Sequence, residues 1–325
     1  MITFERVIFP VGQGGFAYEN IDNYSIVFDC GSSTCPTRVS QYISLLDVKR
    51  KGWIDVLYIS HFDKDHVDGI RELIDVVGVK RAVIPYVPAA FRVAYNAITG
   101  GAYSSIREII TRREIELDEL REERNNNIDV WEWISRPMLT MTDWGVLDHI
   151  FHGEGIDSNL LQDPEYVNQN KNRINDCFKT AFGYQGPNAK GLILLSQKTG
   201  GRIMSNELFV HGEILSVNET AALYTGDANL RANNYVRKVK SFLCEMIRGD
   251  LALMQIPHHG SEYNVGSHFV IDFPARYYYY HDKSSERLRR NQTLYNTLIG
   301  LHKLLDVRDI GSDLIEQRVE IQWYS

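Results

Sequence analysis

The chain has 325 residues, is 44% hydrophobic and carries a formal net charge of −7 at pH 7. This apolar content is enough for one large core or two smaller ones. The acidic balance excludes a surface that attracts nucleic acid as a whole, so any site for a polyanion must be local.

Neither a membrane span nor an export signal is expected. No stretch approaches the ~20 apolar residues that a span needs, and residues 1–6 have no signal-peptide pattern. The four cysteines are scattered along the chain. Cys30 and Cys35 could pair, but we favour a reduced protein of the cytoplasm that does not contact a membrane.

Two strands are predicted before residue 30, followed by a helix. The first, residues 2–11, ends at residues 12–15, where three glycines in four positions allow a tight turn and close backbone approach. The second, residues 25–28, ends at Asp29, a residue type that often forms a turn after a strand. Residues 37–50 then have the apolar spacing of a helix.

The stretch from Asp55 to Gly69 concentrates residues that bind metals. Residues 56–59 form a short apolar run, which is typical of a buried strand. Two histidines and two aspartates follow within residues 61–66, at spacings that allow several side chains to converge on one divalent ion. The alternative is a solvated turn into the next helix, with Asp65 as its cap.

A helix over residues 70–77 and a strand over 80–87 continue the chain, and this alternation predicts a sheet covered by helices. From about residue 90 to 175 the sheet pattern lapses, so we expect a partly helical insertion beside the site. It should contain a charged helix extending from Ile106 to Leu120. Further strands are predicted at residues 192–195, 221–224, 253–256, 277–280 and 319–323, with helices at 234–246 and from Ser284 onward.

Two of these later strands lead into residues that bind metals. The strand at 221–224 leads into Asp227, and the strand at 253–256 leads into His258 and His259. Adjacent residues on a strand point to opposite sides, so one of the two histidines should face the metals. We expect His258 to be that ligand, which leaves His259 to meet the substrate or to support the site.

A compact basic segment lies at the start of the last long helix. It consists of Lys283, Arg287, Arg289 and Arg290. These side chains could follow the phosphate backbone of a nucleic acid, in a protein that is otherwise acidic.

The motif His-x-Asp-x-Asp-His-x-x-Gly at residues 61–69 resembles the signature of the metallo-β-lactamase superfamily. With Ser60 in front, it is similar to the hydrolase domain of the competence-type DNA-uptake proteins, the ComEC family. Other matches follow in the same order along the chain: Val-Gly-Gln-Gly at 11–14, Asp-x-Gly at 29–31, Gly-Asp at 226–227 and His-His-Gly at 258–260. Gly191 stands where that branch has serine, a His-Pro pair is missing, and His281 is a weak substitute for it.

The resemblance implies an α/β fold, the αββα sandwich, with residues 1–325 as one domain and the insertion at about 90–175 inside it. It also implies site roles. The expected metal ligands are His61, Asp63, Asp65, His66, Asp227 and His258. Asp65, Asp227 and His259 are expected to act in catalysis. Asp29 and Asn188 are expected to support the ligands from behind.

Two divalent ions are expected, one held by His61 and Asp63, the other by Asp65, His66 and His258, with Asp227 between them. Carboxylates suit Mn²⁺ or Mg²⁺, and the histidines also allow Zn²⁺. Two such ions lower the pKa of a shared water and hold both oxygens of an in-line displacement. Because the competence-type branch resembles nucleases, the resemblance implies a phosphodiesterase or nuclease acting on DNA or RNA. The alternatives are a hydrolase of a small ester, lactone or cyclic nucleotide, or a metal-binding partner or sensor subunit in a multi-subunit bacterial antiviral defence module.

Overall fold

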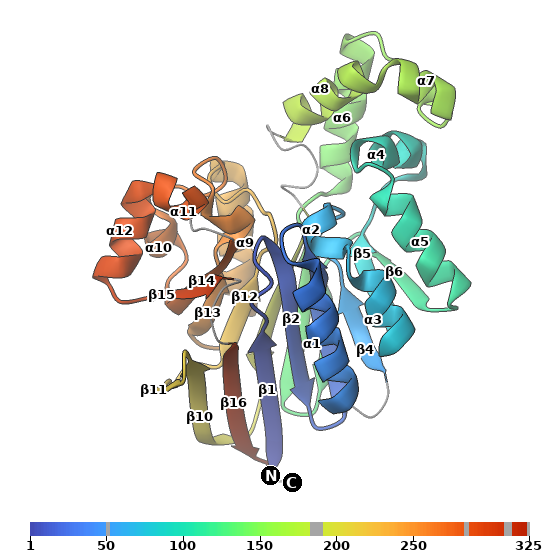
Figure 1. The fold of residues 1–325 in the computed structure, drawn as a ribbon. Coiled ribbons are helices and arrows are strands. Elements are labelled where there is room, and N and C mark those ends of the chain that lie inside the picture. The colour runs from blue at the N-terminus through green and yellow to red at the C-terminus, as the bar shows by residue number, and fades with distance from the viewer. Residues whose placement is uncertain (50–52, 183–190, 283–285, 309–313, 324–325) are drawn as a thin grey trace.

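The computed structural model describes residues 1–49, 53–182, 191–282, 286–308 and 314–323. Two β-sheets face each other, and helices cover their outer surfaces (Figure 1). Among the described residues, no helix is long and apolar enough to cross a membrane.

The first sheet has the strand order β11-β10-β16-β1-β2-β3-β4-β5-β6. Its strands are β1 (Ile2–Ile8), β2 (Gly14–Ile21), β3 (Tyr24–Ser32), β4 (Ile54–Tyr58), β5 (Val79–Pro85), β6 (Glu116–Leu120), β10 (Arg202–Val210), β11 (Glu213–Ser216) and β16 (Ile315–Gln322). Strands β3 to β6 run parallel, and the remaining neighbours are antiparallel.

The second sheet has the strand order β15-β14-β13-β12-β9-β8-β7. Its strands are β7 (Arg124–Ile128), β8 (Trp131–Pro137), β9 (Leu192–Lys198), β12 (Ala221–Tyr224), β13 (Leu251–Gln255), β14 (Ala275–Asp282) and β15 (Leu304–Arg308). Strands β12 to β15 run parallel. The carboxyl ends of the parallel strands in each sheet therefore meet at one edge.

The helices lie outside the sheets. They are α1 (Pro36–Lys49), α2 (Lys64–Val67), α3 (Ile70–Val76), α4 (Arg92–Ile98), α5 (Ala102–Arg112), α6 (Met141–Gly153), α7 (Pro164–Gln169), α8 (Lys171–Phe182), α9 (Asn233–Met246), α10 (Phe269–Asp272), α11 (Glu286–Arg290) and α12 (Gln292–Gly300). Short 3₁₀ turns are η1 (Ala89–Phe91), η2 (Ser158–Leu160) and η4 (Pro257–Gly260).

The strands have two buried faces, because side chains alternate along them. Phe4 and Ile8 of β1 belong to the core between the sheets, whereas Val7 packs in the core under α1 and α3. A third core lies between the second sheet and α9 to α12, around Phe242 and Leu298. The layers are thus helix, sheet, sheet and helix, and the predicted αββα sandwich is confirmed.

A buried polar cluster links the two sheets. Arg6 of β1 and Glu19 of β2 form an ion pair of 2.6 Å with both side chains fully buried. From the second sheet, the hydroxyl groups of Tyr224 and Ser196 donate to Glu19 at 2.5 and 2.6 Å, and the indole of Trp133 donates to the same carboxylate. Buried charges are stabilised only when they are paired and hydrogen-bonded, as they are here.

The expected lapse of sheet structure over about 90–175 is wrong, because β6, β7 and β8 lie within it. The charged helix ends at Arg112 and does not reach Leu120. Glu114 has a left-handed backbone with φ of 54°, which breaks the helix, and the chain then pairs with β5 as strand β6. The helical parts are α4–α5 and α6–α8, in the upper right of Figure 1.

Two further elements differ from the expectation. The long helix after residue 284 is divided into α11 and α12, which are separated at Asn291. Strands β10 and β11, which extend the first sheet at its antiparallel edge, were not predicted. Strands β10 and β11 lie away from the edge where the ligand-type residues gather, whereas α11 lies beside it.

Candidate metal centre

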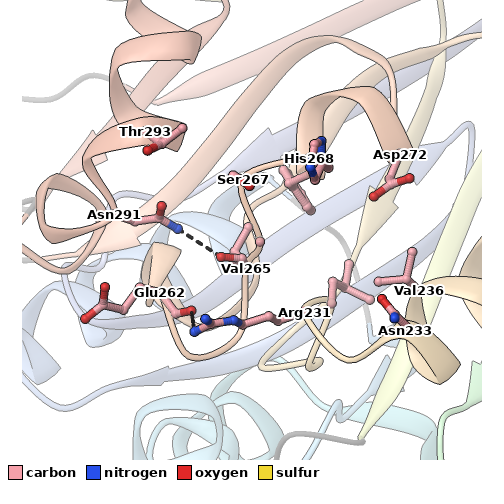
Figure 2. Close-up of a pocket in the computed structure, with 13 residues that line it drawn as sticks. Arg231, Asn233, Val236, Glu262, Val265, Ser267, His268, Asp272, Asn291 and Thr293 are labelled. Atoms are coloured by element: carbon pink, nitrogen blue, oxygen red, sulfur yellow. Dashed lines mark hydrogen bonds between the residues drawn. The ribbon is translucent and has the colours of Figure 1, made fainter.

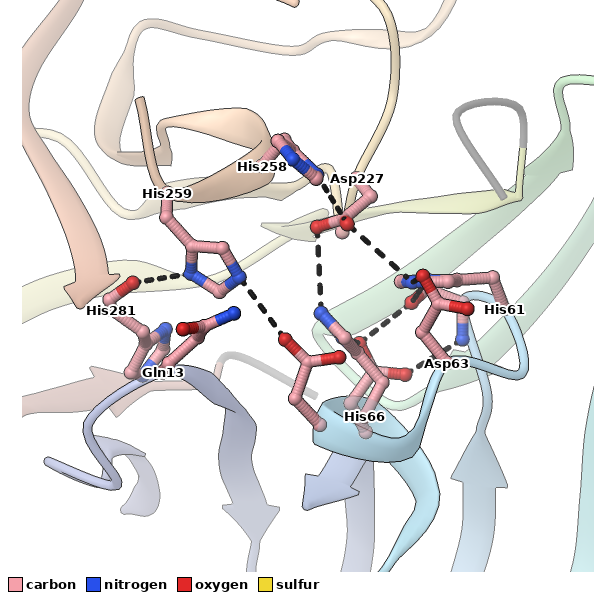
Figure 3. Close-up of polar contacts among 12 residues, drawn as sticks. Gln13, His61, Asp63, His66, Asp227, His258, His259 and His281 are labelled. Atoms are coloured by element: carbon pink, nitrogen blue, oxygen red, sulfur yellow. Dashed lines mark hydrogen bonds and ion pairs between the residues drawn. The ribbon is translucent and has the colours of Figure 1, made fainter. Parts of the chain in front are cut away.

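The carboxyl ends of strands from both sheets bring the predicted ligands together (Figure 3). The residues after β4 come from the first sheet, and those after β12 and β13 come from the second. The converging side chains are His61, Asp63, Asp65, His66, Asp227, His258 and His259. Five of them form two clusters that share His66, whereas Asp63 and His258 lie beside these clusters.

The first cluster consists of three buried residues, His61, His66 and Asp227. Nε2 of His61 lies 3.6 Å from Oδ2 of Asp227, and Nε2 of His66 lies 3.4 Å from Oδ1. Within the described residues, both Nε2 atoms and Oδ1 are buried without a hydrogen-bond partner. Buried polar atoms normally have one. Ligand atoms bound at about 2.1 Å in tetrahedral geometry lie about 3.4 Å apart, so the set fits a divalent cation.

Asp63 lies beside this first cluster. Its Oδ2 atom is 3.7 Å from Nε2 of His61, and its side chain is 39% exposed. Burial raises the pKa of Asp63, with the neighbouring Asp227 and Asp65 carboxylates acting in the same direction and His61 opposing. Asp63 is therefore placed where it could complete the coordination of an ion held by His61 and Asp227.

The second cluster consists of Asp65, His66 and His259. Nε2 of His259 lies 3.3 Å from Oδ2 of Asp65, and the side chain of Gln13 lies directly beneath this histidine in Figure 3. Burial opposes ionisation of Asp65, but the hydrogen bond from His259 and the charge of His66 hold its pKa below the usual range.

Each of three histidines has its Nδ1 atom occupied and its Nε2 atom turned toward the centre. Nδ1 of His66 lies 2.7 Å from Oδ2 of Asp29, Nδ1 of His61 lies 2.9 Å from Oγ of Ser60, and Nδ1 of His259 donates to the carbonyl of His281. Such partners fix the orientation of ligand imidazoles in metal sites. The same rings present Nε2 as the atom available to a metal.

Asp29 lies beneath the centre and connects several of these groups. Its carboxylate accepts 2.7 Å hydrogen bonds from the backbone N–H and the hydroxyl of Ser60, in addition to the bond with His66. Burial alone would lower the pKa of His66, but the charges of Asp29 and Asp227 outweigh it and raise that pKa well above its ordinary value. Metal binding would therefore displace a proton from His66.

Two glycines permit close backbone approach around the centre. A Cβ atom at Gly15 would lie 2.9 Å from Nδ1 of His66. A Cβ atom at Gly191 would lie 2.1 Å from the carbonyl oxygen of Ser60, which also accepts a 2.7 Å bond from the N–H of Leu192. The start of β9 thus presses on the loop that carries His61, which explains glycine at position 191. Asn188 lies outside the described residues.

The assumption that His258 and His259 continue a strand is wrong. Strand β13 ends at Gln255, and the next residues form η4. His258, His259 and Gly260 have φ angles of 49°, 54° and 80°, so all three are left-handed. Alternation along a strand therefore does not apply to the two histidines.

His258 consequently occupies a different place from the one expected. Its Nδ1 atom lies 2.5 Å from Oδ2 of Asp227, and its Nε2 atom lies 3.4 Å from Nη1 of Arg287. It belongs to neither ligand cluster, although it touches Asp227. The geometry favours His259 over His258 as the ligand that the second sheet contributes.

A separate pocket of about 310 Å³ lies beside the centre, between α9, α10 and α12 (Figure 2). Its Arg231 donates to the carbonyl of Glu262 at 2.7 Å, and its Asn291 donates to the carbonyl of Val265 at 3.0 Å. Asn264, which lies between Glu262 and Val265 in the sequence, donates to the carbonyl of Asp227 at 3.2 Å. The polar groups of this pocket thus hold the loop that supports Asp227.

No protein-family model and no curated protein matches the chain. Among solved structures, CmlA, a diiron β-hydroxylase from Streptomyces venezuelae, is similar with a TM-score of 0.50 and 12% identity, over 95% of this chain and 53% of that one. The chain therefore spans about half the length of CmlA.

Two other solved structures align over nearly their whole length. Igni18, a metallo hydrolase from Ignicoccus hospitalis, has a TM-score of 0.47 and 11% identity over 96% of this chain and 98% of that one. YhfI from Bacillus subtilis, described as a metallo-β-lactamase fold protein, has a TM-score of 0.46 and 8% identity over the same shares. The chain shares the overall fold of CmlA, and its own layers form the αββα sandwich described above. The narrower resemblance to the competence-type branch stays a prediction.

Sequence reasoning missed a residue that anchors the loop carrying His61, Asp63, Asp65 and His66. Phe62, between His61 and Asp63, is fully buried, and its ring meets Tyr95 of α4 and Tyr103 of α5 edge-on at centroid distances of 6.0 and 5.1 Å. The apolar residue between two polar ligands was the available signal. Helices α4 and α5 thus help to position the loop that carries His61 and Asp63, through their contacts with Phe62.

The predicted basic segment is divided by the structure. Arg287 lies beside His258, whereas Arg289 is exposed over the ring of Tyr295 at 6.0 Å, and Arg290 is exposed. Lys283 lies outside the described residues. His281 is buried, its Nε2 atom lies 3.1 Å from the carbonyl of Phe9, and burial lowers its pKa to about 3.

Proposed function

We propose that the protein is a metal-dependent hydrolase that cleaves phosphodiesters with two divalent ions, and that DNA or RNA is its substrate. The observation that carries this proposal is a set of ligand atoms on His61, His66 and Asp227 that are buried without a hydrogen-bond partner in the part of the chain that the structure describes. Three such atoms at 3.4–3.6 Å from a neighbour are difficult to explain in a folded core without a cation.

The clusters suggest how the ligands are divided. His61, Asp63 and Asp227 would hold one ion, and Asp65, His66 and His259 the other, with Asp227 close enough to serve both. A pair of divalent ions supplies a hydroxide nucleophile near neutral pH and neutralises charge on the reacting group. The chain's own contribution is orientation of the ligands, through Asp29 and the carbonyl of His281.

The ligand set contains three carboxylates and three imidazoles. Carboxylates favour Mn²⁺ or Mg²⁺, and imidazole suits Zn²⁺ and iron as well. We propose Mn²⁺ as the preferred ion, because Asp63 replaces the histidine that the superfamily signature usually has.

The leading substrate is supported by the position of α11, whose arginines lie at and beyond the rim of the centre. The resemblance to the competence-type hydrolases points the same way. A small ester, lactone or cyclic nucleotide is the alternative, and the acidic net charge of −7 favours it. A third possibility is a metal-binding or sensor subunit in a cytoplasmic, multi-protein antiviral module.

The test combines metal analysis with a substrate panel. Protein purified without chelator should hold one to two divalent ions per chain, and after chelation Mn²⁺ should restore more activity than Zn²⁺. The panel contains single- and double-stranded DNA, RNA and bis-p-nitrophenyl phosphate. His61→Ala should lose metal and activity, whereas His149→Ala, at an exposed position on α6, should keep both. Absence of metal before and after loading would refute the proposal.

A further inference from the structure

Arg287 lies at the rim of the candidate metal centre, on the short helix α11. Its Nη1 atom is 3.4 Å from Nε2 of His258, and Nδ1 of that imidazole is 2.5 Å from Oδ2 of Asp227. Asp227 in turn faces Nε2 of His61 and of His66 at 3.6 and 3.4 Å. One imidazole therefore separates the guanidinium from the carboxylate in the middle of the centre.

Packing of α11 against the histidine turn fixes this position. Leu288, next to Arg287, is fully buried, and a Cβ atom at Gly260 would lie 2.7 Å from its Cδ1 atom. Glycine suits position 260 for this reason and because its φ is 80°. Since the same turn carries both histidines, α11 cannot move away without disturbing them.

The guanidinium of Arg287 is available to an anion. Within the described ranges no carboxylate pairs with it, and His258 is its polar contact. Arg6, by contrast, is fully buried and forms an ion pair with Glu19. A guanidinium has five N–H donors in a planar fork that matches two oxygens of a phosphate, so one contact with an imidazole leaves most of its donors unused.

We infer that Arg287 binds a non-bridging oxygen of a phosphoryl group held at the metal centre. The inference rests on the proposed phosphodiesterase function and adds a basis for selectivity. A phosphodiester carries a negative charge on its non-bridging oxygens, whereas a carboxylic ester is neutral. Arg287 therefore stabilises the binding of the first substrate class and not of the second.

This role differs from that of a general basic patch. Arg289 and Arg290 are exposed further along α11, and Arg289 lies over the ring of Tyr295. We expect them to contact only a substrate long enough to extend beyond the centre. Arg287 is close enough to the centre to act on the smallest phosphodiester as well.

The experiment compares the metal-loaded wild type with Arg287→Gln, Arg287→Lys and a control, Arg276→Gln. Arg276 is an exposed arginine beside the ring of Tyr277 at 5.6 Å, near the start of β14 and remote from His281 at its other end. The readouts are metal content, calorimetric binding of inorganic phosphate, and hydrolysis of bis-p-nitrophenyl phosphate and p-nitrophenyl acetate.

Arg287→Gln should weaken phosphate binding and lower kcat/KM for the phosphodiester by about 10- to 100-fold. Metal content and acetate hydrolysis should stay at the wild-type level. Arg287→Lys should recover part of the loss, because it keeps the charge without the fork. Arg276→Gln should match the wild type in every readout.

Two results would overturn the inference while leaving the proposed function in place. One is phosphate affinity in Arg287→Gln equal to that of Arg276→Gln. The other is an equal fall in acetate and phosphodiester hydrolysis, which would mean that Arg287 only orients His258. Failure of the wild type to bind metal would instead refute the proposed function. A wild type that binds metal but not phosphate would refute the Arg287 assignment.

Discussion

Nε2 of His259 lies 3.3 Å from Oδ2 of Asp65, across 194 positions of sequence. Asp65 follows a strand of the first sheet and His259 follows a strand of the second, so this contact joins the facing edges of the sandwich. Its neighbour His258 faces Asp227 and Arg287 instead, because the backbone between the histidines is left-handed.

The first prediction concerns this pair of histidines. His259→Ala should weaken metal binding by more than the about 10- to 100-fold that follows loss of a ligand's hydrogen-bond partner. His258→Ala should retain the wild-type metal content, because its ring lies outside both ligand clusters. Elemental analysis and calorimetry would measure the difference. A larger loss of metal binding in His258→Ala than in His259→Ala would identify His258 as the ligand. Equal losses of metal binding in the two variants would indicate that the turn has lost its structure.

The second prediction concerns protons. In the metal-free protein the raised pKa of His66 keeps the ring protonated at neutral pH, so a metal must displace that proton. Apparent metal affinity should therefore rise with pH up to the pKa of His66 and then level off. Calorimetry at pH 7 in buffers of different ionisation enthalpy should report about one proton released at this ring.

Asp29→Asn is the matched variant for that experiment. It removes the charge that raises the pKa of His66 and keeps the size of the side chain. Proton release should fall, and the pH dependence of metal affinity should shift to lower pH. The same proton release in both proteins would contradict the assignment of the proton to His66.

The third prediction concerns Gly191. Gly191→Ser installs the residue that the competence-type branch has, but its Cβ would meet the carbonyl of Ser60 at 2.1 Å. We expect a loss of about 1–3 kcal/mol in unfolding free energy, with reduced metal content because Ser60 adjoins His61. Gly145→Ala, on an exposed face of α6 with open space around it, should instead stabilise by about 0.5–1 kcal/mol. Urea titration measures both, and an unchanged Gly191→Ser would refute the argument.

The fourth prediction concerns longer substrates. Arg289→Gln with Arg290→Gln should weaken nucleic-acid binding and reduce the slope of log affinity against log salt by roughly 0.9 per lost phosphate contact on duplex DNA. Turnover of bis-p-nitrophenyl phosphate should be unaffected, because both side chains are exposed, whereas Arg287 of the same helix contacts His258. Equal loss of both activities would assign these arginines to the fold. A wild type that binds no nucleic acid at low salt would favour the small-ester alternative.

The sandwich and the gathering of ligand-type residues were predictable from the chain, for one physical reason. Polar metal-binding side chains follow directly after short apolar runs, and the ends of parallel strands meet at one edge. His61, His66 and Asp227 therefore converge as expected from sequence order alone. Register between the two sheets did not have to be known.

The orientation of His258 and His259 was not predictable, because it depends on a left-handed backbone, which is uncommon for residues other than glycine and is not signalled by the residue types here. Strand β6 was missed for a related reason. Its residues have charged helix-like spacing, and only a long-range partner, β5, makes them a strand. The role of Phe62 depends on helices that lie more than thirty positions away.

The buried ion pair of Arg6 and Glu19 has a consequence for how the molecule comes apart. Glu19 also accepts hydrogen bonds from Tyr224 and Ser196 in the opposite sheet. Separating the sheets would therefore break several hydrogen bonds to the buried Glu19 carboxylate at once. Partial opening is thereby penalised, and amide exchange in β1, β2 and β12 should proceed only through global unfolding. Each sheet contributes part of the candidate metal centre, so separating the sheets would also separate Asp227 and His259 from His61, Asp65 and His66.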